Sequence, residues 1–574
     1  MKLAPWVAAI MVAWAGCAEL PLAPPLTSPK HGGAAWSHVR SRHFIVDSDL
    51  GPARTRELAV ELDGIETAFE DLTADREYES TERIEVVSFA RRQDYLEIAK
   101  QHQQPSSSAF FAYQTHDFEP RPTIVISGDL NEETRTVLQH ELTHRFVRQQ
   151  MRDVPTWLSE GLADYNSTLA LRDGKAWLGA MPPHWIPLVR PGGSIAIGRD
   201  ARQRRLTIDD LPTVQWLLEA TPATFYFHIE DTPNPEQPLA YAGAWLLVHM
   251  LKAPNLPFSG RFDRLIALLS GGMHRDAAFA QAFAGVPMAE LERQYRGHAA
   301  ELSAPVLPDG ERWTTFSSGA YTPRAVAPVD DATSLSDAQV HLVFLRLRAW
   351  QPPYRDATNG ELVSAQIDAP ADPEVLYWRA LFALSGGASA NAEPPLRQAL
   401  QTSPREPRYW LALCEARVQT LLHSGAKHEP ELFAPLEDDF QQLASVAKSA
   451  TALNGVARYH WLRANAKAGM PYAIRAVQAD PTCAQCFDTM ALLYAQRGLF
   501  VQAVEAEERA STLMPAWAQL PDVAPRLAEF RRRAAAPPTE TDAPATQAAA
   551  PTTTTPPPAP TPTTTPPPPP APTP

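Results

Sequence analysis

The chain has 574 residues, which is enough for three or four domains of ordinary size. Hydrophobic residues make up 44% and charged residues 20%, as is usual for globular proteins. The formal net charge of -14 disfavours nucleic acid as a partner, because phosphate binding requires a basic surface. Only four cysteines are present, so a disulfide framework is excluded.

Residues 1–17 have the layout of a secretory signal peptide, with a positive start, an uncharged apolar run and then small residues. Ala13-Trp14-Ala15 fits ordinary signal peptidase, whereas Ala15-Gly16-Cys17 resembles a lipobox in which Cys17 is lipidated. The usual leucine three residues before that cysteine is Trp14 here. We expect export to the bacterial cell envelope, as a periplasmic protein or an outer-membrane lipoprotein, with secretion as the alternative. A lipid anchor is the only membrane contact we expect, because no later stretch approaches the ~20 apolar residues of a membrane helix.

Residues 18–35 are rich in proline and glycine and are predicted to be a linker. Residues 36–305 are then predicted to form one α+β domain. Its expected strands lie at 43–46, 84–89, 109–113 and 123–127, and its first helices at 54–72 and 92–102. Asp129 or Asn131 can cap the next helix, whose first turn holds two glutamates favoured by the helix dipole.

That next helix contains the pattern His140-Glu141-Leu142-Thr143-His144. Residues four apart lie one above the other on a helix face, so both imidazoles can reach one ion at the ~2.0–2.1 Å that zinc requires. Glu141 lies beside that face, where it can reach a water. Leu138, Leu142 and Phe146 form a separate apolar stripe that can anchor the helix in a core.

A second segment, Trp157 to Tyr165, reads W-L-S-E-G-L-A-D-Y. Together the two segments resemble the gluzincin zinc metallopeptidases, and the short connection between them is similar to that of compact bacterial peptidase-MA-like proteins. The resemblance implies a zincin-like fold, bound Zn²⁺, and Glu160 as the third metal ligand. It also implies that Asp164 is the carboxylate that bonds a zinc-bound histidine.

The reaction that this resemblance implies is peptide-bond hydrolysis of a peptide or protein substrate, with Glu141 as the general base. Tyr241 is our candidate for stabilising the oxyanion, with Tyr165 and His228 as alternatives. Residues 108–113 correspond to the edge strand that pairs with extended substrate in this family. A degenerate pseudopeptidase, or a non-catalytic scaffold that binds a cell-envelope partner, is the alternative. A structural zinc site normally has four protein ligands, so three ligands plus a general base favour catalysis.

After a predicted linker at 306–335, residues 336–520 are helical and partly repetitive. Residues 476–481 recur as 510–515, a period of 34, with small residues at Ala491 and Ala503 and an aromatic one at Tyr494. This pattern resembles tetratricopeptide (TPR) repeats, which implies a protein partner on a concave surface; a solenoid with only a packing role is the alternative.

Two remaining features are less specific. Cys483 and Cys486 form a lone C-x-x-C pair, for which packing or a local disulfide is the simplest interpretation. Residues 534–574 are mostly Pro, Thr and Ala, cannot bury a core, and are predicted to be a disordered tail.

Overall fold

The computed structural model describes residues 26–536 apart from 72–82, 103, 105–107, 113–121, 152, 190–192, 198–203, 227–236, 254, 304–318, 349–354, 425–428 and 515–519. The predicted signal peptide with Cys17, His228, and residues 537–574 of the predicted tail therefore lie outside the described residues. Within them, no helix is both long enough and apolar enough to span a bilayer.

A six-stranded mixed sheet lies at the centre of the first domain. Its strand order is β11 (Thr333–Ser334), β1 (Ser37–Arg40), β2 (Phe44–Ser48), β3 (Ile84–Phe89), β5 (Thr123–Ser127) and β4 (Ala109–Ala112). β2, β3 and β5 are parallel, and the other neighbours are antiparallel. The strands expected from the sequence are found here within two residues at their ends, and β4 is an edge strand as predicted.

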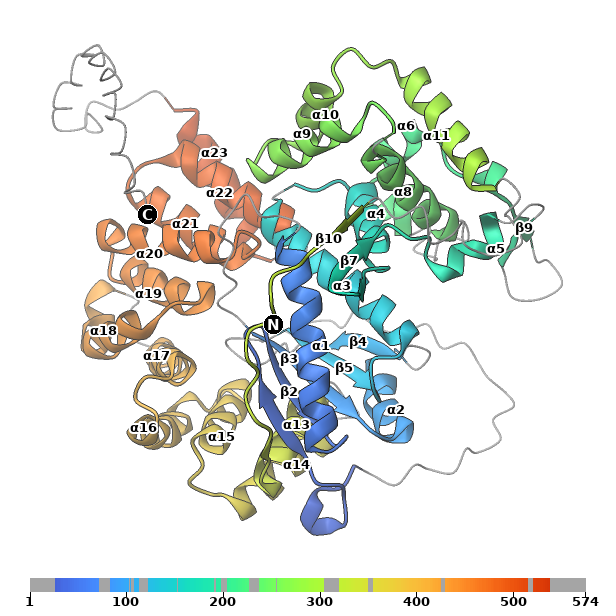
Figure 1. Cartoon of the computed structure of the whole chain (residues 1–574). Coiled ribbons are helices and arrows are strands. Elements are labelled where there is room, and N and C mark those ends of the chain that lie inside the picture. Colours follow the sequence, from blue (N-terminus) through green and yellow to red (C-terminus); the bar gives the residue numbers. More distant parts are fainter. Residues whose placement is uncertain are drawn as a thin grey trace, which may run out of the picture.

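Helices cover both faces of this sheet (Figure 1). Alternate residues point to opposite faces: Val86 and Ile124 pack with α1 (Pro52–Asp71) and α3 (Glu132–Gln150), whereas Val87 and Val125 pack with α2 (Arg92–Gln101) and α13 (Asp337–Leu347). Burial on both faces explains why these strands are almost continuously apolar.

The chain after α3 is mainly helical. α4 (Thr156–Asn166) packs along α8 (Gln237–Lys252), and shorter helices surround this pair. These are α5 (Ile186–Val189), α6 (Val214–Glu219), α7 (Pro222–Tyr226), α9 (Ser259–Ser270), α10 (Arg275–Ala282) and α11 (Met288–Ser303). Two small antiparallel sheets lie in this domain as well. One has the strand order β10 (Gly319–Tyr321), β7 (Lys175–Leu178) and β6 (Ala170–Arg172). The other is the hairpin of β8 (Ile195–Ile197) and β9 (Arg204–Leu206).

The segment expected to be a linker, 306–335, contributes two strands to the first domain. β10 pairs with β7, and β11 pairs with β1. Helix α13, expected to begin the repeats, buries Val340, Val343 and Phe344 against the sheet. Strands of two or three residues carry too little alternation to be recognised in a sequence, and an apolar helix stripe does not reveal whether a helix or a sheet covers it.

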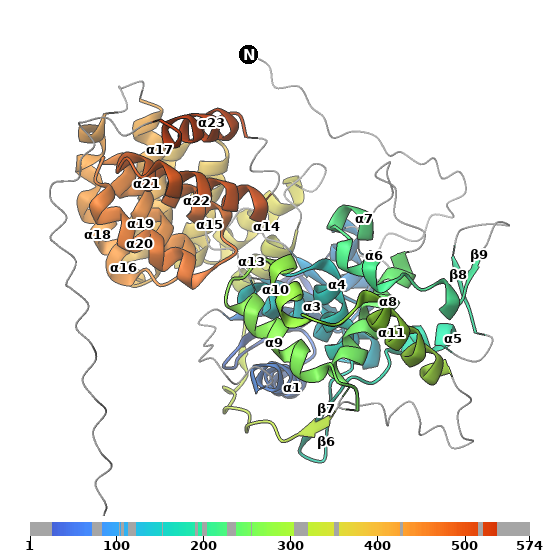
Figure 2. The same cartoon turned by 90° about the horizontal axis from the view of Figure 1, so that it is seen from above.

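The remaining C-terminal chain is a stack of antiparallel helices (Figures 1 and 2). They are α14 (Arg355–Asp368), α15 (Pro373–Ser385), α16 (Glu393–Thr402), α17 (Pro407–Leu422), α18 (Glu437–Val446), α19 (Ala450–Leu462), α20 (Ala466–Ala479), α21 (Ala484–Gln496), α22 (Phe500–Leu513) and α23 (Val523–Ala534). Helix starts recur at a spacing of 34 residues, from α19 to α21 and from α20 to α22. Ala491 and Ala503 are fully buried where these helices meet. The prediction of a helical repeat region is confirmed.

The C-x-x-C pair lies at the start of α21. Cys483 and Cys486 form a disulfide, and Cys483 caps the helix with its sulfur accepting from the Cys486 backbone N–H at 3.1 Å. The pair therefore has a local structural role within the repeats.

Candidate metal centre

Helix α3 presents the two histidines from a firmly capped start. The Asn131 side chain accepts a hydrogen bond from the Thr134 backbone N–H at 2.8 Å, and Glu132 and Glu133 occupy the first turn. Leu138 and Leu142 are buried in the main core, so the opposite face of the helix carries His140 and His144.

Helix α4 supplies the acidic side chains. It begins after Pro155 and buries Trp157 and Leu158 almost completely. Glu160 and Asp164, one turn apart, are also buried, with 4% and 3% of their surfaces exposed. Burying two carboxylates is costly unless cations or hydrogen bonds compensate them, and both face the histidines of α3.

Three donor atoms converge between these helices. His140 Nε2 lies 3.1 Å from His144 Nε2, and Glu160 Oε2 lies 3.5 Å and 3.3 Å from those two nitrogens. Donor atoms around a tetrahedral ion with bonds of ~2.0–2.1 Å are ~3.3 Å apart. Two imidazole nitrogens at this separation share either a proton or a metal ion, and the three separations fit a tetrahedral zinc ion.

The other nitrogen of each histidine has its own partner. His140 Nδ1 donates to Asp164 Oδ1 at 2.9 Å, and His144 Nδ1 lies 3.0 Å from Ser159 Oγ. Asp164 is itself fixed by Trp185, whose indole N–H donates to Oδ2 at 3.1 Å. Such partners fix the ring tautomer, so each Nε2 is left with a lone pair for a metal.

The charges around His140 are strongly coupled. Burial lowers the pKa of His140, but the Asp164 and Glu160 carboxylates outweigh burial and raise it to about 10. Without a metal ion, His140 therefore holds a proton at neutral pH. A metal ion must displace that proton to bind at the same position.

A cavity of about 910 Å³ opens beside the three donors. Its lining includes His140, Glu141, Asp164 and Tyr241. The Tyr241 ring centre is 6.4 Å from that of His140. Burial, with the nearby Glu160 and Asp164 carboxylates, raises the pKa of Tyr241, so its hydroxyl keeps the proton needed to donate a hydrogen bond. The cavity volume of about 910 Å³ lies within the usual range for sites that bind small ligands.

The two alternatives to Tyr241 differ in position. Tyr165 is 1% exposed and packs against His249 in the core, and it is not part of the cavity lining. His228 lies outside the described residues. Tyr241 is thus the one of the two described tyrosines that faces the cavity.

Glycine at position 161 lets α4 and α8 approach closely. A Cβ placed there would lie 2.4 Å from the carbonyl oxygen of Ala244 on α8. This approach brings Tyr241 of α8 toward Glu160 of α4. The glycine that follows Glu160 therefore has a packing role, which the sequence motif alone does not explain.

Sequence reasoning missed Ser159 and Trp185. Ser159 lies inside the recognised segment, but its role depends on the angle at which α4 crosses α3. Trp185 belongs to η2 (Pro183–Trp185), some twenty residues away, and no spacing pattern connects it with Asp164.

Comparisons with known proteins found similarity among solved structures alone. No protein-family model matches the chain, and no protein of curated function matches it. Among solved structures, the thermophilic TPR protein TTC0263 of Thermus thermophilus is 18% identical with a TM-score of 0.28, covering 34% of this chain and 97% of that one. MamA protein is 14% identical with a TM-score of 0.22, covering 28% and 89%. The MamA RS-1 ArsTM double mutant is 15% identical with a TM-score of 0.22, covering 28% and 91%. Because these TM-scores are low, we base the assignment of helical repeats on the helix pairs of this chain.

Proposed function

We propose that this protein is an exported zinc-dependent peptidase whose helical repeats bind a protein partner or substrate. The proposal rests on one observation: the donor atoms of His140, His144 and Glu160 lie close together, and His140 and Glu141 line a large cavity beside them. A site with three protein donors and an open side is typical of catalytic zinc, whereas structural zinc is usually enclosed by four protein ligands.

His140, His144 and Glu160 would hold the metal. When bound, Zn²⁺ acts as a Lewis acid that polarises a carbonyl group and lowers the pKa of water. Asp164 and Ser159 keep the two imidazoles oriented through their Nδ1 atoms.

Glu141 and Tyr241 have the complementary proton roles. The Glu141 carboxylate accepts a proton from the attacking water and passes it to the nitrogen of the leaving amine. The Tyr241 hydroxyl donates a hydrogen bond to the oxygen of the substrate carbonyl as negative charge develops there. β4 is the last strand at one edge of the sheet in the part of the chain that the structure describes, where an extended peptide backbone can add as a further strand.

The test compares Glu141→Gln with wild type for zinc content and for cleavage of a peptide library. We expect Glu141→Gln to keep zinc and lose turnover by about 10²–10⁴-fold, the usual contribution of a general base. His140→Ala, His144→Ala and Glu160→Ala should each lose one zinc ion per chain relative to wild type, namely the ion of this site. Glu219→Gln, an exposed glutamate of α6, is the matched control and should change neither quantity.

Two outcomes would contradict these assignments. Full zinc occupancy in Glu160→Ala would remove Glu160 from the ligand set. Loss of zinc in Glu141→Gln would mean that Glu141 has a ligand role and is not only a base.

A non-catalytic scaffold is the second candidate. The paired helices from α14 to α23 support it, because stacked helical repeats usually form a protein-binding surface. A scaffold with a degenerate metal site predicts that wild type binds zinc yet cleaves no member of the peptide library. Equal inactivity of wild type and Glu141→Gln, with zinc bound to both, would favour this candidate.

A further inference from the structure

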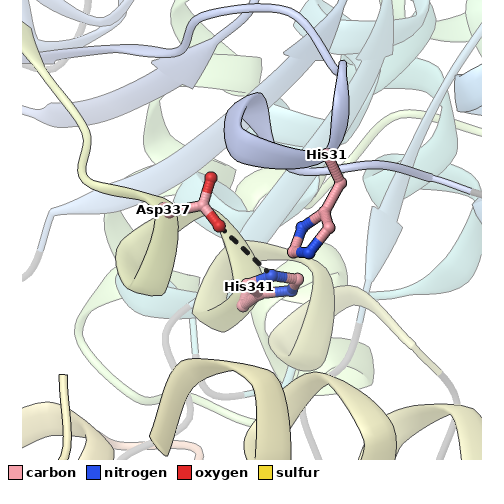
Figure 3. A group of neighbouring side chains, drawn as sticks. All are labelled: His31, Asp337 and His341. Carbon is pink, nitrogen blue, oxygen red and sulfur yellow. Dashed lines mark ion pairs between the residues drawn. The ribbon is translucent and has the colours of Figure 1, made fainter. Parts of the chain in front are cut away.

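We propose that His31, Asp337 and His341 form a second metal site, which takes a divalent transition ion such as Zn²⁺ and has a structural role. The site joins η1 (Pro29–His31), near the start of the described chain, to the first turns of α13. Figure 3 shows the two histidine rings and the carboxylate turned toward one another. The proposal does not depend on the peptidase function.

Two buried donor atoms face each other at the centre of the cluster. His341 Nε2 and Asp337 Oδ2 are 3.6 Å apart, and neither makes a hydrogen bond. Both residues are 7% exposed. An unsatisfied buried polar atom destabilises a fold, so two that face one common point indicate that something binds between them.

His341 has the orientation of a metal ligand. Its Nδ1 donates to Glu361 Oε2 of α14 at 2.7 Å, and Arg348 holds the other oxygen of Glu361 at 2.9 Å. The carboxylate fixes the tautomer with the proton on Nδ1, so Nε2 retains its lone pair. This carboxylate–histidine pair has the arrangement that orients histidines in metal sites.

The other two donors are held in the same way. His31 Nδ1 lies 2.8 Å from Ser28 Oγ, and Asp337 Oδ1 accepts from the Lys30 backbone N–H at 2.8 Å. Each residue thus has one atom fixed by a neighbour and a second atom available to an ion. All three available donors lie within 4.8 Å of one another.

The donor set identifies the class of ion. Two imidazoles and one carboxylate suit zinc or cobalt, whereas magnesium and calcium prefer oxygen ligands alone. A tetrahedral zinc ion needs donors ~3.3 Å apart, so donors that lie within 4.8 Å of one another must draw closer, and the exposed His31 is the one that can move most easily. Asp368, which neighbours Asp337 and pairs with Lys30 Nζ at 2.5 Å, can supply a fourth oxygen.

The site would fasten the N-terminal segment to the junction of the two regions. His31 precedes the first strand of the sheet, and α13 lies between that sheet and the helical repeats. A metal ion at this point would add to the contacts that hold these parts together, and its removal should lower the stability of the junction.

The test measures metal in the full-length protein by mass spectrometry after dialysis against Zn²⁺ or Co²⁺. Wild type should hold about two ions per chain, and the His140→Ala/His144→Ala variant should hold about one. Adding His31→Ala to that variant should reduce it to near zero. His31 is exposed, so this change leaves the fold intact, as circular dichroism will check. His423→Ala, another exposed histidine, is the matched control and should keep one ion.

A second measurement follows the stability. EDTA should lower the melting temperature of the His140→Ala/His144→Ala variant, and His31→Ala should remove that shift. If that variant holds no ion, or if its ion survives His31→Ala, the cluster is a metal-free ion pair and the proposal is overturned. A wild type with one ion that is lost with His140 and His144 would overturn this inference while leaving the peptidase proposal standing.

Discussion

Replacing Gly161 with alanine is expected to force helix α4 away from helix α8. The new Cβ would lie 2.4 Å from the Ala244 carbonyl oxygen and 2.7 Å from Val248 Cγ2. A backbone carbonyl cannot rotate aside as a flexible side chain can, so the helices themselves must separate. Because α4 carries Glu160 and α8 carries Tyr241, the separation should also disturb the metal centre.

The expected change in the free energy of unfolding of Gly161→Ala is the difference between two effects. Overpacking a close contact costs about 1–3 kcal/mol, and the backbone clash places this case in the upper half of that range. Glycine to alanine inside a helix gains about 0.5–1 kcal/mol by itself. The net loss should be about 1–2.5 kcal/mol, which corresponds to a fall of about 2–10 °C in melting temperature for a large domain.

The assay is differential scanning calorimetry with Gly297→Ala as the control. Gly297 is also inside a helix, α11, but nothing lies within 4 Å of a Cβ at that position. Gly297→Ala should therefore raise stability by about 0.5–1 kcal/mol, while Gly161→Ala lowers it. If Gly161→Ala proves as stable as Gly297→Ala, the close approach of α4 and α8 does not exist as described.

Four further predictions follow from the same structure. Asp164→Asn should weaken zinc binding about 10–100-fold in a chelator competition, because it removes the carboxylate that orients His140. Folding raises the pKa of His140 from about 6.5 to about 10, so the stability of the metal-free protein, measured by urea unfolding, should fall as the pH rises through that range. For the same reason, zinc binding at pH 8 should displace about one proton from His140, which calorimetry in buffers of different ionisation enthalpy will count. Ala491→Phe should cost about 1–3 kcal/mol within the repeats and leave the zinc content unchanged. A chain that ends at residue 305 should lose zinc and aggregate, whereas one that ends after α14 should keep its zinc, because only the longer chain retains β10, β11 and α13 on the sheet.

The sequence alone determined the elements whose signals are local. Apolar periodicity gave β3 and β5 with their observed limits, and the cap and first-turn charges gave the start of α3. The H-E-x-x-H spacing put both histidines on one helix face, since that depends only on 3.6 residues per turn. The 34-residue recurrence likewise predicted the helix pairs of the repeats.

Contacts between distant segments were decided by the tertiary structure. Glu160 was identified by resemblance, but Ser159 and Trp185 became visible as partners only once α4 and η2 had packed beside α3. Helix α13 looks like any amphipathic helix, yet it covers a sheet in which every strand except β11 lies about 210–310 residues earlier. His31 and His341 are separated by about 310 positions, and no local pattern links them. Local signals arise from the backbone of one segment, whereas these contacts depend on how separate apolar faces pack together, and no single segment contains that information.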